Sequence, residues 1–163
     1  MRFSRIATAF ILLGLALAIV IAVNAFVAEP FIVNGISMQP SYNPGDYLVI
    51  DRLAYRHSDP QIGDVIVFQY PLDPSIDYIK RVVARPGALV DENTGRVLAA
   101  SSSQSIDPYL MRDENSSTTI ELASDEYFVL GDNRAESSDS RVWGPLQRKY
   151  IIGKVVARLW PLP

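Results

Sequence analysis

Residues 64–84 read DVIVFQYPLDPSIDYIKRVVA, and this stretch decides the fold class. It contains two runs rich in β-branched and aromatic residues, 64–69 and 77–84, separated by a segment with two prolines. Such runs, bounded by proline, glycine and aspartate, are typical of short β-strands. Neither run has the length or the periodicity of an amphipathic helix. The stretch therefore predicts two consecutive β-strands.

The same pattern continues in both directions. Short apolar runs alternate with turn residues from residue 29 to residue 163, and no long segment of this part has helical periodicity. We therefore expect a predominantly β domain over residues 29–163. A Ser-rich, polar segment at 99–119 is too long for a hairpin turn, and we expect it to be a surface excursion. The other predicted strands are 31–33, 47–51, 89–90, 96–98, 126–130 and 150–159.

The composition excludes several classes of function. The chain of 163 residues has a net charge of -3 and so lacks the broad basic surface that a nucleic-acid partner requires. It has no cysteine, which excludes disulfides, thiolate metal sites and cysteine nucleophiles. The only histidine, His57, lies in a polar, proline-containing segment that predicts a solvated turn. The base for any activated serine is therefore expected to be a group other than imidazole.

An uncharged apolar segment precedes the β domain. Residues 7–28 contain no charge, and about 20 apolar residues suffice to cross the hydrocarbon core of a bilayer. The segment therefore predicts a transmembrane helix. Arg2 and Arg5 precede it and Glu29 follows it, which by the positive-inside rule places the amino terminus in the cytoplasm and residues 29–163 outside.

A cleavable secretory signal is the competing interpretation of this segment. Its apolar region would be about 7–15 residues long and would be followed by a small-x-small site. Here the Ala-x-Ala triplets at 7–9 and 16–18 lie inside the apolar run instead. The sequence therefore favours a retained anchor over residues 1–28, made of a cytoplasmic tip and the membrane span.

A candidate nucleophile follows the apolar segment closely. Residues 34–40 read NGISMQP, which places Ser37 between a Gly-containing turn and a proline, where a hydroxyl can be held on a defined backbone. Ser37 lies nine positions after Ala28, so an extended chain at about 3.6 Å per residue keeps its hydroxyl within about 32 Å of the bilayer. Taken alone, however, the pattern favours an ordinary turn serine.

The three lysines are the candidate bases for such a serine. Lys149 lies in a charged turn, where its ammonium is expected to stay solvated. Lys80 and Lys154 both lie within predicted strands, and burial there would favour a neutral amine. Alternation puts Lys80 on a face with apolar neighbours, but the opposite face, which carries Arg81, is apolar as well. The pattern leaves open whether Lys80 is buried or is an exposed charge on an edge strand.

The segment 131–144, GDNRAESSDSRVWG, is densely polar although it directly follows a predicted strand. It can be a long turn held by side-chain hydrogen bonds and by an ion pair between Asp139 and Arg141. It can also be a rigid loop that orients a hydroxyl onto a catalytic amine. The residues by themselves leave both interpretations open.

Three separated segments together resemble the type I signal peptidase, or leader peptidase, family. Residues 37–40, SMQP, resemble its Ser-Met-x-Pro nucleophile box, residues 78–87, YIKRVVARPG, resemble its lysine box, and residues 131–144 resemble its third box. The boxes follow an apolar span in the family's order, and the likeness covers most of residues 26–153. The third box joined to the lysine box makes the resemblance highly specific.

The resemblance implies a membrane-bound serine endopeptidase that removes N-terminal signal peptides from exported preproteins after small-x-small sites. It implies a single transmembrane helix followed by an antiparallel β-sheet or coiled β-barrel catalytic domain, and no metal or organic cofactor. The expected partners are signal peptides and membrane lipid, and the expected location is the plasma or inner membrane. Substrates would bind by strand addition along a sheet edge.

The resemblance also implies roles for five residues through their positions in the boxes. Ser37 would be the nucleophile, and its backbone N–H would stabilise the oxyanion. Lys80 would be the general base, and Ser137 the hydroxyl that orients the lysine amine. Asp139 and Arg141 would form a supporting ion pair near the site.

The sequence departs from the family's pattern at three places. Gly35 stands where some members have a helping hydroxyl, which leaves the second oxyanion donor open. Residues 41–42, Ser-Tyr, replace the usual Thr-Leu, and Ala88 replaces a common aspartate. The changes at 41–42 and at Ala88 remove no catalytic atom.

Two other interpretations stay open at the level of the sequence. The chain could be a related serine-lysine protease that processes a single partner protein. It could also be a tethered β domain that binds exported proteins without cleaving them. Substitution of Ser37 and Lys80 separates the second of these from an enzyme.

Overall fold

The computed structural model describes residues 11–17, 28–99 and 118–160. Residues 28–99 and 118–160 contain ten strands, a short helix and one turn of 3-10 helix, and residues 11–17 are helical. The strands are β1 (Ala28–Ile32), β2 (Tyr47–Asp51), β3 (Val65–Tyr70), β4 (Asp73–Ala84), β5 (Leu89–Asp91), β6 (Val97–Ala99), β7 (Thr119–Glu121), β8 (Glu126–Leu130), β9 (Leu146–Gln147) and β10 (Ile151–Trp160), and the helices are α2 (Ser140–Trp143) and η1 (Arg148–Tyr150).

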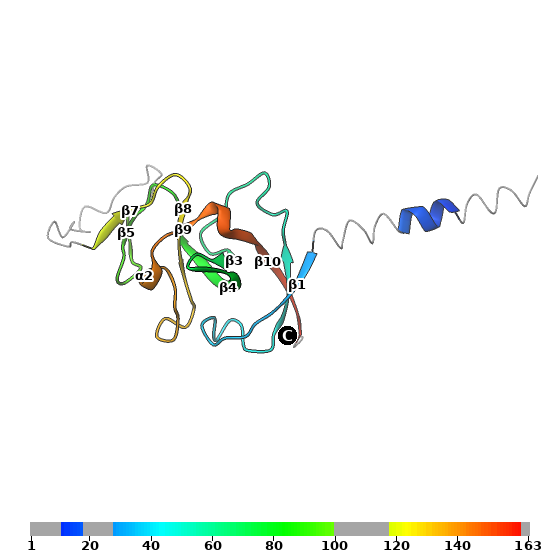
Figure 1. Ribbon diagram of the computed structural model, residues 1–163, viewed down its shortest axis with the longest axis horizontal. Coiled ribbons are helices and arrows are strands. Elements are labelled where there is room, and N and C mark those ends of the chain that lie inside the picture. Colours follow the sequence, from blue (N-terminus) through cyan, green and yellow to red (C-terminus); the bar gives the residue numbers. More distant parts are fainter. Residues whose placement is uncertain (1–10, 18–27, 100–117, 161–163) are drawn as a thin grey trace, which may run out of the picture.

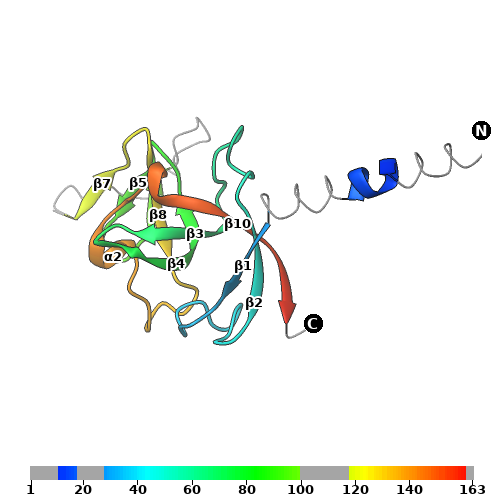
Figure 2. The ribbon, with the colours of Figure 1, turned by 45° about the vertical axis from the view of Figure 1, so that its right-hand side comes forward.

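The strands form two antiparallel sheets (Figure 1). One has seven strands in the order β1-β2-β10-β3-β4-β8-β9, and the other has three in the order β6-β5-β7. The expected mainly β, antiparallel domain is therefore confirmed. Within the described residues the larger sheet has two end strands, β1 and β9, which do not pair with each other. It is therefore an open sheet and not the closed barrel that the resemblance gave as an alternative. The sheet is nevertheless curved, as the ribbon shows from a second direction (Figure 2).

The hairpin of β3 and β4 lies in the middle of the larger sheet, where the sequence predicted two consecutive strands. The strands pair antiparallel, with Val65 opposite Arg81 and Ile66 opposite Lys80. Four successive residues, 65–68, are buried, because side chains pack against both faces of the sheet at this point. This double coverage explains why the run is continuously apolar instead of alternating.

The strand β4 begins four residues earlier than predicted. The prolines before residue 77 were expected to mark a break, but the strand starts at Asp73 and includes Pro74. A proline is tolerated because residues 74–76 fall in a register shift, between the pairs Gln69–Asp77 and Tyr70–Asp73. This first part of β4 is exposed, whereas the part after Asp77 enters the core.

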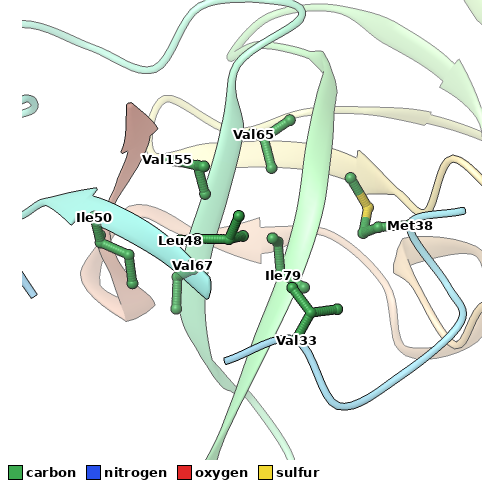
Figure 3. Close-up of a cluster of buried hydrophobic side chains, with 8 residues drawn as sticks. All are labelled: Val33, Met38, Leu48, Ile50, Val65, Val67, Ile79 and Val155. Carbon is green, nitrogen blue, oxygen red and sulfur yellow. The ribbon is translucent and has the colours of Figure 1, made fainter. Parts of the chain in front are cut away.

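A buried apolar cluster on one face of the larger sheet joins the segments that carry Ser37 and Lys80 (Figure 3). Met38 follows Ser37 and Ile79 precedes Lys80, and both side chains belong to this cluster. The packing therefore brings two residues that are 43 positions apart in the chain to the same place. The cluster consists of Val33, Met38, Leu48, Ile50, Val65, Val67, Ile79 and Val155.

The amino-terminal segment is described only in part. Residues 11–17 are helical, and the remaining residues of the predicted span, 7–10 and 18–27, lie outside the described residues. Ala28 is already the first residue of β1, where it pairs with Asp51, so the helix cannot extend to Ala28 as predicted. Among the described residues no helix has the length and apolar character needed to cross a membrane.

The two ends of the predicted Ser-rich segment belong to strands of the smaller sheet. Residues 100–117 of the predicted excursion lie outside the described residues, and its two ends belong to β6 and β7. The prediction therefore missed β7, and it also missed β9 and α2. These elements have two to four residues each, which is too short for a hydrophobic period to be visible.

We expect the core around Ser37 and Lys80 to tolerate loss of volume poorly. Leu48→Ala, at a side chain with no exposed surface, should lower the free energy of unfolding by about 2–5 kcal/mol through lost burial and a cavity. Leu72→Ala is the matched control, because Leu72 is 72 % exposed and its change should be within about 0.5 kcal/mol. Denaturant unfolding of the detergent-solubilised chain measures both. Equal values for the two variants would contradict the placement of the core.

Candidate active site

The segment between β1 and β2 fixes the backbone on both sides of Ser37. Val33 and Met38 are buried in the core, and the Val33 N–H donates to the Asp46 carbonyl oxygen at 3.0 Å. The Asp46 side chain is itself buried and accepts from the Asn43 N–H at 2.9 Å. Ser37 thus lies on a loop whose two anchors cannot move independently of the sheet.

Lys80 reaches Ser37 from β4. Its Nζ donates to Ser37 Oγ at 2.7 Å and to the Ile79 carbonyl oxygen at 3.0 Å. The residue is only 4 % exposed. The sequence alone did not show which face of this strand is buried. Ile79 packs in one core cluster and Val82 in another, so both faces of β4 are covered at this level.

Burial controls the protonation of this amine. Desolvation lowers the pKa of Lys80 from 10.5 to about 8, while the negative charge of Asp139 acts in the opposite direction. A substantial fraction of the amine is therefore neutral at mildly alkaline pH. A neutral amine 2.7 Å from a hydroxyl can accept its proton, which is the requirement for a general base.

The loop that follows β8 holds Ser37 from the other side. The Asn133 N–H donates to the Ser37 carbonyl oxygen at 2.9 Å, and Asn133 Nδ2 donates to the Ile36 carbonyl oxygen at 3.3 Å. Gly131 makes this approach possible. A Cβ at that position would lie 2.5 Å from the Ser37 carbonyl oxygen and would also collide with the Ser137 side chain.

Asp139 organises this loop from a fully buried position. Its carboxylate accepts from the Gly131 N–H at 3.0 Å and from Arg141 Nε at 2.8 Å, so the predicted contact between Asp139 and Arg141 is present. Burial alone would raise the pKa of Asp139, but the hydrogen bonds from Arg141 and Gly131 hold it below its ordinary value. Asp139 therefore carries a negative charge that acts on Lys80.

Ser137 lies in the same loop, but it does not make the contact that the resemblance implies. Its Oγ is shielded from solvent and has no hydrogen-bond partner of acceptable geometry among the described residues, Lys80 included. The donor and acceptor capacity of the hydroxyl is thus unused in this arrangement.

A groove of about 790 Å³ opens beside Ser37 and Lys80, which is within the usual range for a binding site. Its walls come from β1, from the loop at 34–37 and from residues 75–80 of β4. Three strands separate β1 from β4 in the sheet order, so the curvature of the sheet is what makes them face each other. The Ser37 N–H makes no hydrogen bond within the described part of the chain and is available to a ligand in the groove.

Comparison of the sequence with known proteins shows the family of this chain. A sequence model for the family described as signal peptidase, peptidase S26, matches residues 6–160. The chain belongs to this peptidase family. Similar proteins include the probable signal peptidase I-1 of Synechocystis sp., 36 % identical over 157 residues that cover 92 % of this chain and 80 % of the relative. Another is the signal peptidase I of Pseudomonas aeruginosa, 32 % identical, with 90 % of this chain and 70 % of the relative covered.

A solved structure is also similar to this S26 peptidase. It is the crystal structure of a signal peptidase I from Enterococcus faecalis V583, which is 27 % identical and matches with a TM-score of 0.43. The match covers 61 % of this chain and 98 % of that chain. The family assignment itself rests on the sequence matches, and they confirm the predicted peptidase class.

The peptidase contains a pair of charged residues to which the sequence analysis gave no role. Arg81 Nε and Nη2 donate to the two carboxylate oxygens of Asp132 at 2.8 and 2.7 Å, and Arg81 Nη1 donates to the Gly63 carbonyl oxygen at 2.8 Å. This bidentate pair, the fork of Arg81 on Asp132, joins β4 next to Lys80 to the loop that contacts Ser37. The only signal in the sequence is that each charge lies within a family box, Arg81 in 78–87 and Asp132 in 131–144.

The remaining candidates of the sequence analysis lie outside the site. His57 is exposed in a bend, as predicted, and Lys149 is exposed in η1. Lys154 forms an ion pair with Asp64 at 2.6 Å. Across residues 11–17, 28–99 and 118–160, no group of three or more His, Asp or Glu side chains is arranged to hold a metal ion.

The close approach at Gly131 predicts that a single methyl group impairs catalysis. Gly131→Ala should push the loop away from the Ser37 carbonyl and lower kcat about 100-fold, because displacements of about 1 Å have effects of this size. Gly153→Ala is the control, since its Cβ would lie 2.5 Å from the Asp51 carbonyl oxygen, between β10 and β2. It should lower stability with little change in kcat of the folded protein. Similar kcat values for both variants would contradict a specific role for Gly131.

Proposed function

We propose that this chain is a membrane-anchored serine endopeptidase that cleaves signal peptides from exported preproteins after small-x-small sites, by means of a serine-lysine dyad. The observation that carries the proposal is the 2.7 Å contact between Lys80 Nζ and Ser37 Oγ with the amine buried. The substrate class is supported by the relatives, which are named as signal peptidases.

The reaction would proceed through an acyl-enzyme. Neutral Lys80 accepts the Ser37 hydroxyl proton while Oγ attacks the scissile carbonyl carbon, and the Ser37 N–H donates to the oxyanion that forms. The lysine ammonium then gives its proton to the departing amine, which leaves as the new amino terminus. A water molecule, deprotonated by Lys80, attacks the ester and releases the signal peptide.

The surrounding charges suit this cycle. Asp139 opposes the full effect of burial on Lys80, so it favours the ammonium that exists between proton uptake and proton delivery. Arg141 keeps Asp139 ionised. We assign to Ser137 the orientation of the Lys80 amine during the cycle, and the support for this role is its shielded hydroxyl with unused hydrogen-bonding capacity.

The groove suits an extended peptide with small side chains. Its lining includes Phe31, Ile36, Ile76 and Ile79 around the open N–H of Ser37, so apolar side chains limit the room near the reacting atoms. β1 is an end strand of the sheet and lies along the groove. An end strand has unpaired backbone groups, and an extended substrate can pair with them.

Membrane anchorage would place this groove near its substrates. The apolar residues 7–28 end where β1 begins, and the lining of the groove starts with Glu29. A signal peptide held in the same bilayer would therefore present its carboxyl-terminal end close to Ser37. The anchor contributes proximity, which raises the effective concentration of a membrane-bound substrate.

Removal of either dyad member tests the proposal directly. Ser37→Ala removes the nucleophile and Lys80→Ala removes the base, so each should reduce preprotein cleavage by about 10⁴-fold or more. Lys154→Ala is the control, because that lysine is paired with Asp64 and should keep nearly full activity. Cleavage of a preprotein by the detergent-solubilised variants, with far-UV circular dichroism to verify folding, is the measurement. Full activity of Lys80→Ala with loss in Lys154→Ala would reassign the base.

The lowered pKa of Lys80 predicts an alkaline rise in activity. The active form is the neutral amine, so below the pKa kcat/KM should increase about tenfold per pH unit and should level off above about pH 8. Initial rates on a signal-peptide substrate between pH 6 and pH 10 measure this profile. A midpoint near 10.5, the ordinary value for lysine, or no dependence on pH at all, would count against a buried lysine base.

A further inference from the structure

A second concavity, which the proposed reaction does not use, lies at the other end of β1 from Ser37. Its volume is about 250 Å³. It lies at the base of the loop that leaves β2, and in both views this loop projects from the opposite end of the sheet to the loop that follows β1 (Figures 1 and 2). We call it the arginine pocket; its lining is Arg52, Leu53, Tyr55, Arg56, Arg148, Ile151 and Ile152.

The arginine pocket carries positive charge that the protein does not neutralise. Within the described residues, neither Arg56 nor Arg148 forms an ion pair with a carboxylate. Arg148 Nη2 donates to the Tyr55 carbonyl oxygen at 2.6 Å, which orders the guanidinium without cancelling its charge. Of the three arginines in the lining, only Arg52 has a carboxylate partner among the described residues, Glu29 at 3.1 Å. Two arginines without a carboxylate partner in the lining of one small hollow favour an anion with several oxygens, and phosphate is the best match to the geometry of a guanidinium.

The other lining residues limit what kind of phosphate compound can bind. Leu53, Ile151 and Ile152 give the hollow an apolar side, and Leu53 is 42 % exposed. The volume accommodates a phosphate group with a small substituent but not a nucleotide, whose base and sugar would extend far outside it. A phosphate ester with an apolar portion next to it fits the charged and the apolar sides together.

The arginine pocket lies next to the end of the predicted membrane segment, and this position indicates the source of such a phosphate. Arg52 contacts Glu29, the residue directly after the apolar segment at 7–28. If that segment spans the bilayer, as proposed above, the pocket opens at the depth of the lipid headgroups. Anionic headgroups attract basic side chains at this depth.

We propose that the arginine pocket binds the phosphate of an anionic membrane phospholipid. The inference rests on the membrane anchorage in the proposed function but not on the serine-lysine chemistry. Arg56 and Arg148 hold the phosphate oxygens, and the apolar side receives the first part of the acyl chains. Because Glu29 joins the arginine pocket through Arg52 and also lines the substrate groove, a bound headgroup fixes the starting point of β1 relative to the membrane.

Lipid binding can be measured without any cleavage. The full-length chain in a neutral detergent is titrated calorimetrically with dihexanoyl phosphatidylglycerol, dihexanoyl phosphatidylcholine and inorganic phosphate. We expect saturable binding of phosphatidylglycerol and at least tenfold weaker binding of the other two. Arg56→Gln and Arg148→Gln should each weaken phosphatidylglycerol binding about tenfold, because each removes a charge-assisted hydrogen bond. Arg96→Gln, at an exposed arginine next to the smaller sheet, is the charge-matched control and should bind normally.

Three results would overturn the inference. The first is equal binding of the two lipids, the second is unchanged phosphatidylglycerol binding when Arg56 and Arg148 are both replaced, and the third is inorganic phosphate binding as tightly as the lipid, which would indicate a soluble anion. The Ser37→Ala variant separates this inference from the proposed function, since it should bind lipid normally. Arg56→Gln should conversely keep its cleavage rate on a soluble peptide in detergent. Arg56 is the more informative position, because Arg148 also holds the Tyr55 carbonyl.

Discussion

A lysine amine must be kept out of water if it is to act as a base, and the packing around Lys80 meets that requirement. An amine on an ordinary strand would have one face toward solvent. Here apolar side chains cover both faces of β4, so a side chain on either face of the strand is buried at the level of Lys80. Asp139 has no exposed surface and is held ionised by Arg141. Its negative charge stabilises the lysine ammonium and so offsets part of the effect of burial on Lys80. The result is a pKa that lies between those of a free and a fully desolvated lysine.

The side chains of Ser37 and Lys80 are brought together by contacts of neighbouring residues as well as by their own hydrogen bond. Met38 and Ile79 pack in one cluster, and the fork of Arg81 on Asp132 joins the lysine strand to the loop that contacts the Ser37 carbonyl. The same loop supplies Asp139. A single segment of 14 residues, 131–144, therefore contacts the backbone of the proposed nucleophile and supplies a charge that acts on the proposed base.

The sequence predicted the class of the fold well, and the bounds of β2 and β8 agree with the expected strands. It could not place Lys80 inside or outside, because alternation distinguishes faces only when one of them is polar. The fork of Arg81 and Asp132 joins residues 51 positions apart, and the demand for Gly131 arises from an approach of two loops; neither has a local signature. Ser37, Lys80 and their neighbours were identified by their resemblance to family boxes, since pattern alone favoured an ordinary turn serine.

The two ends of the larger sheet differ in a way that affects how the protein behaves outside the cell membrane. β9 has two residues and offers other chains almost nothing to pair with, whereas β1 has five, with Ile32 exposed at its end. An end strand that is open to one peptide, as proposed for β1, is also open to other extended chains. Concentrated preparations without a bound peptide are therefore prone to self-association along β1, and a short strand-like ligand in the groove should keep them monodisperse.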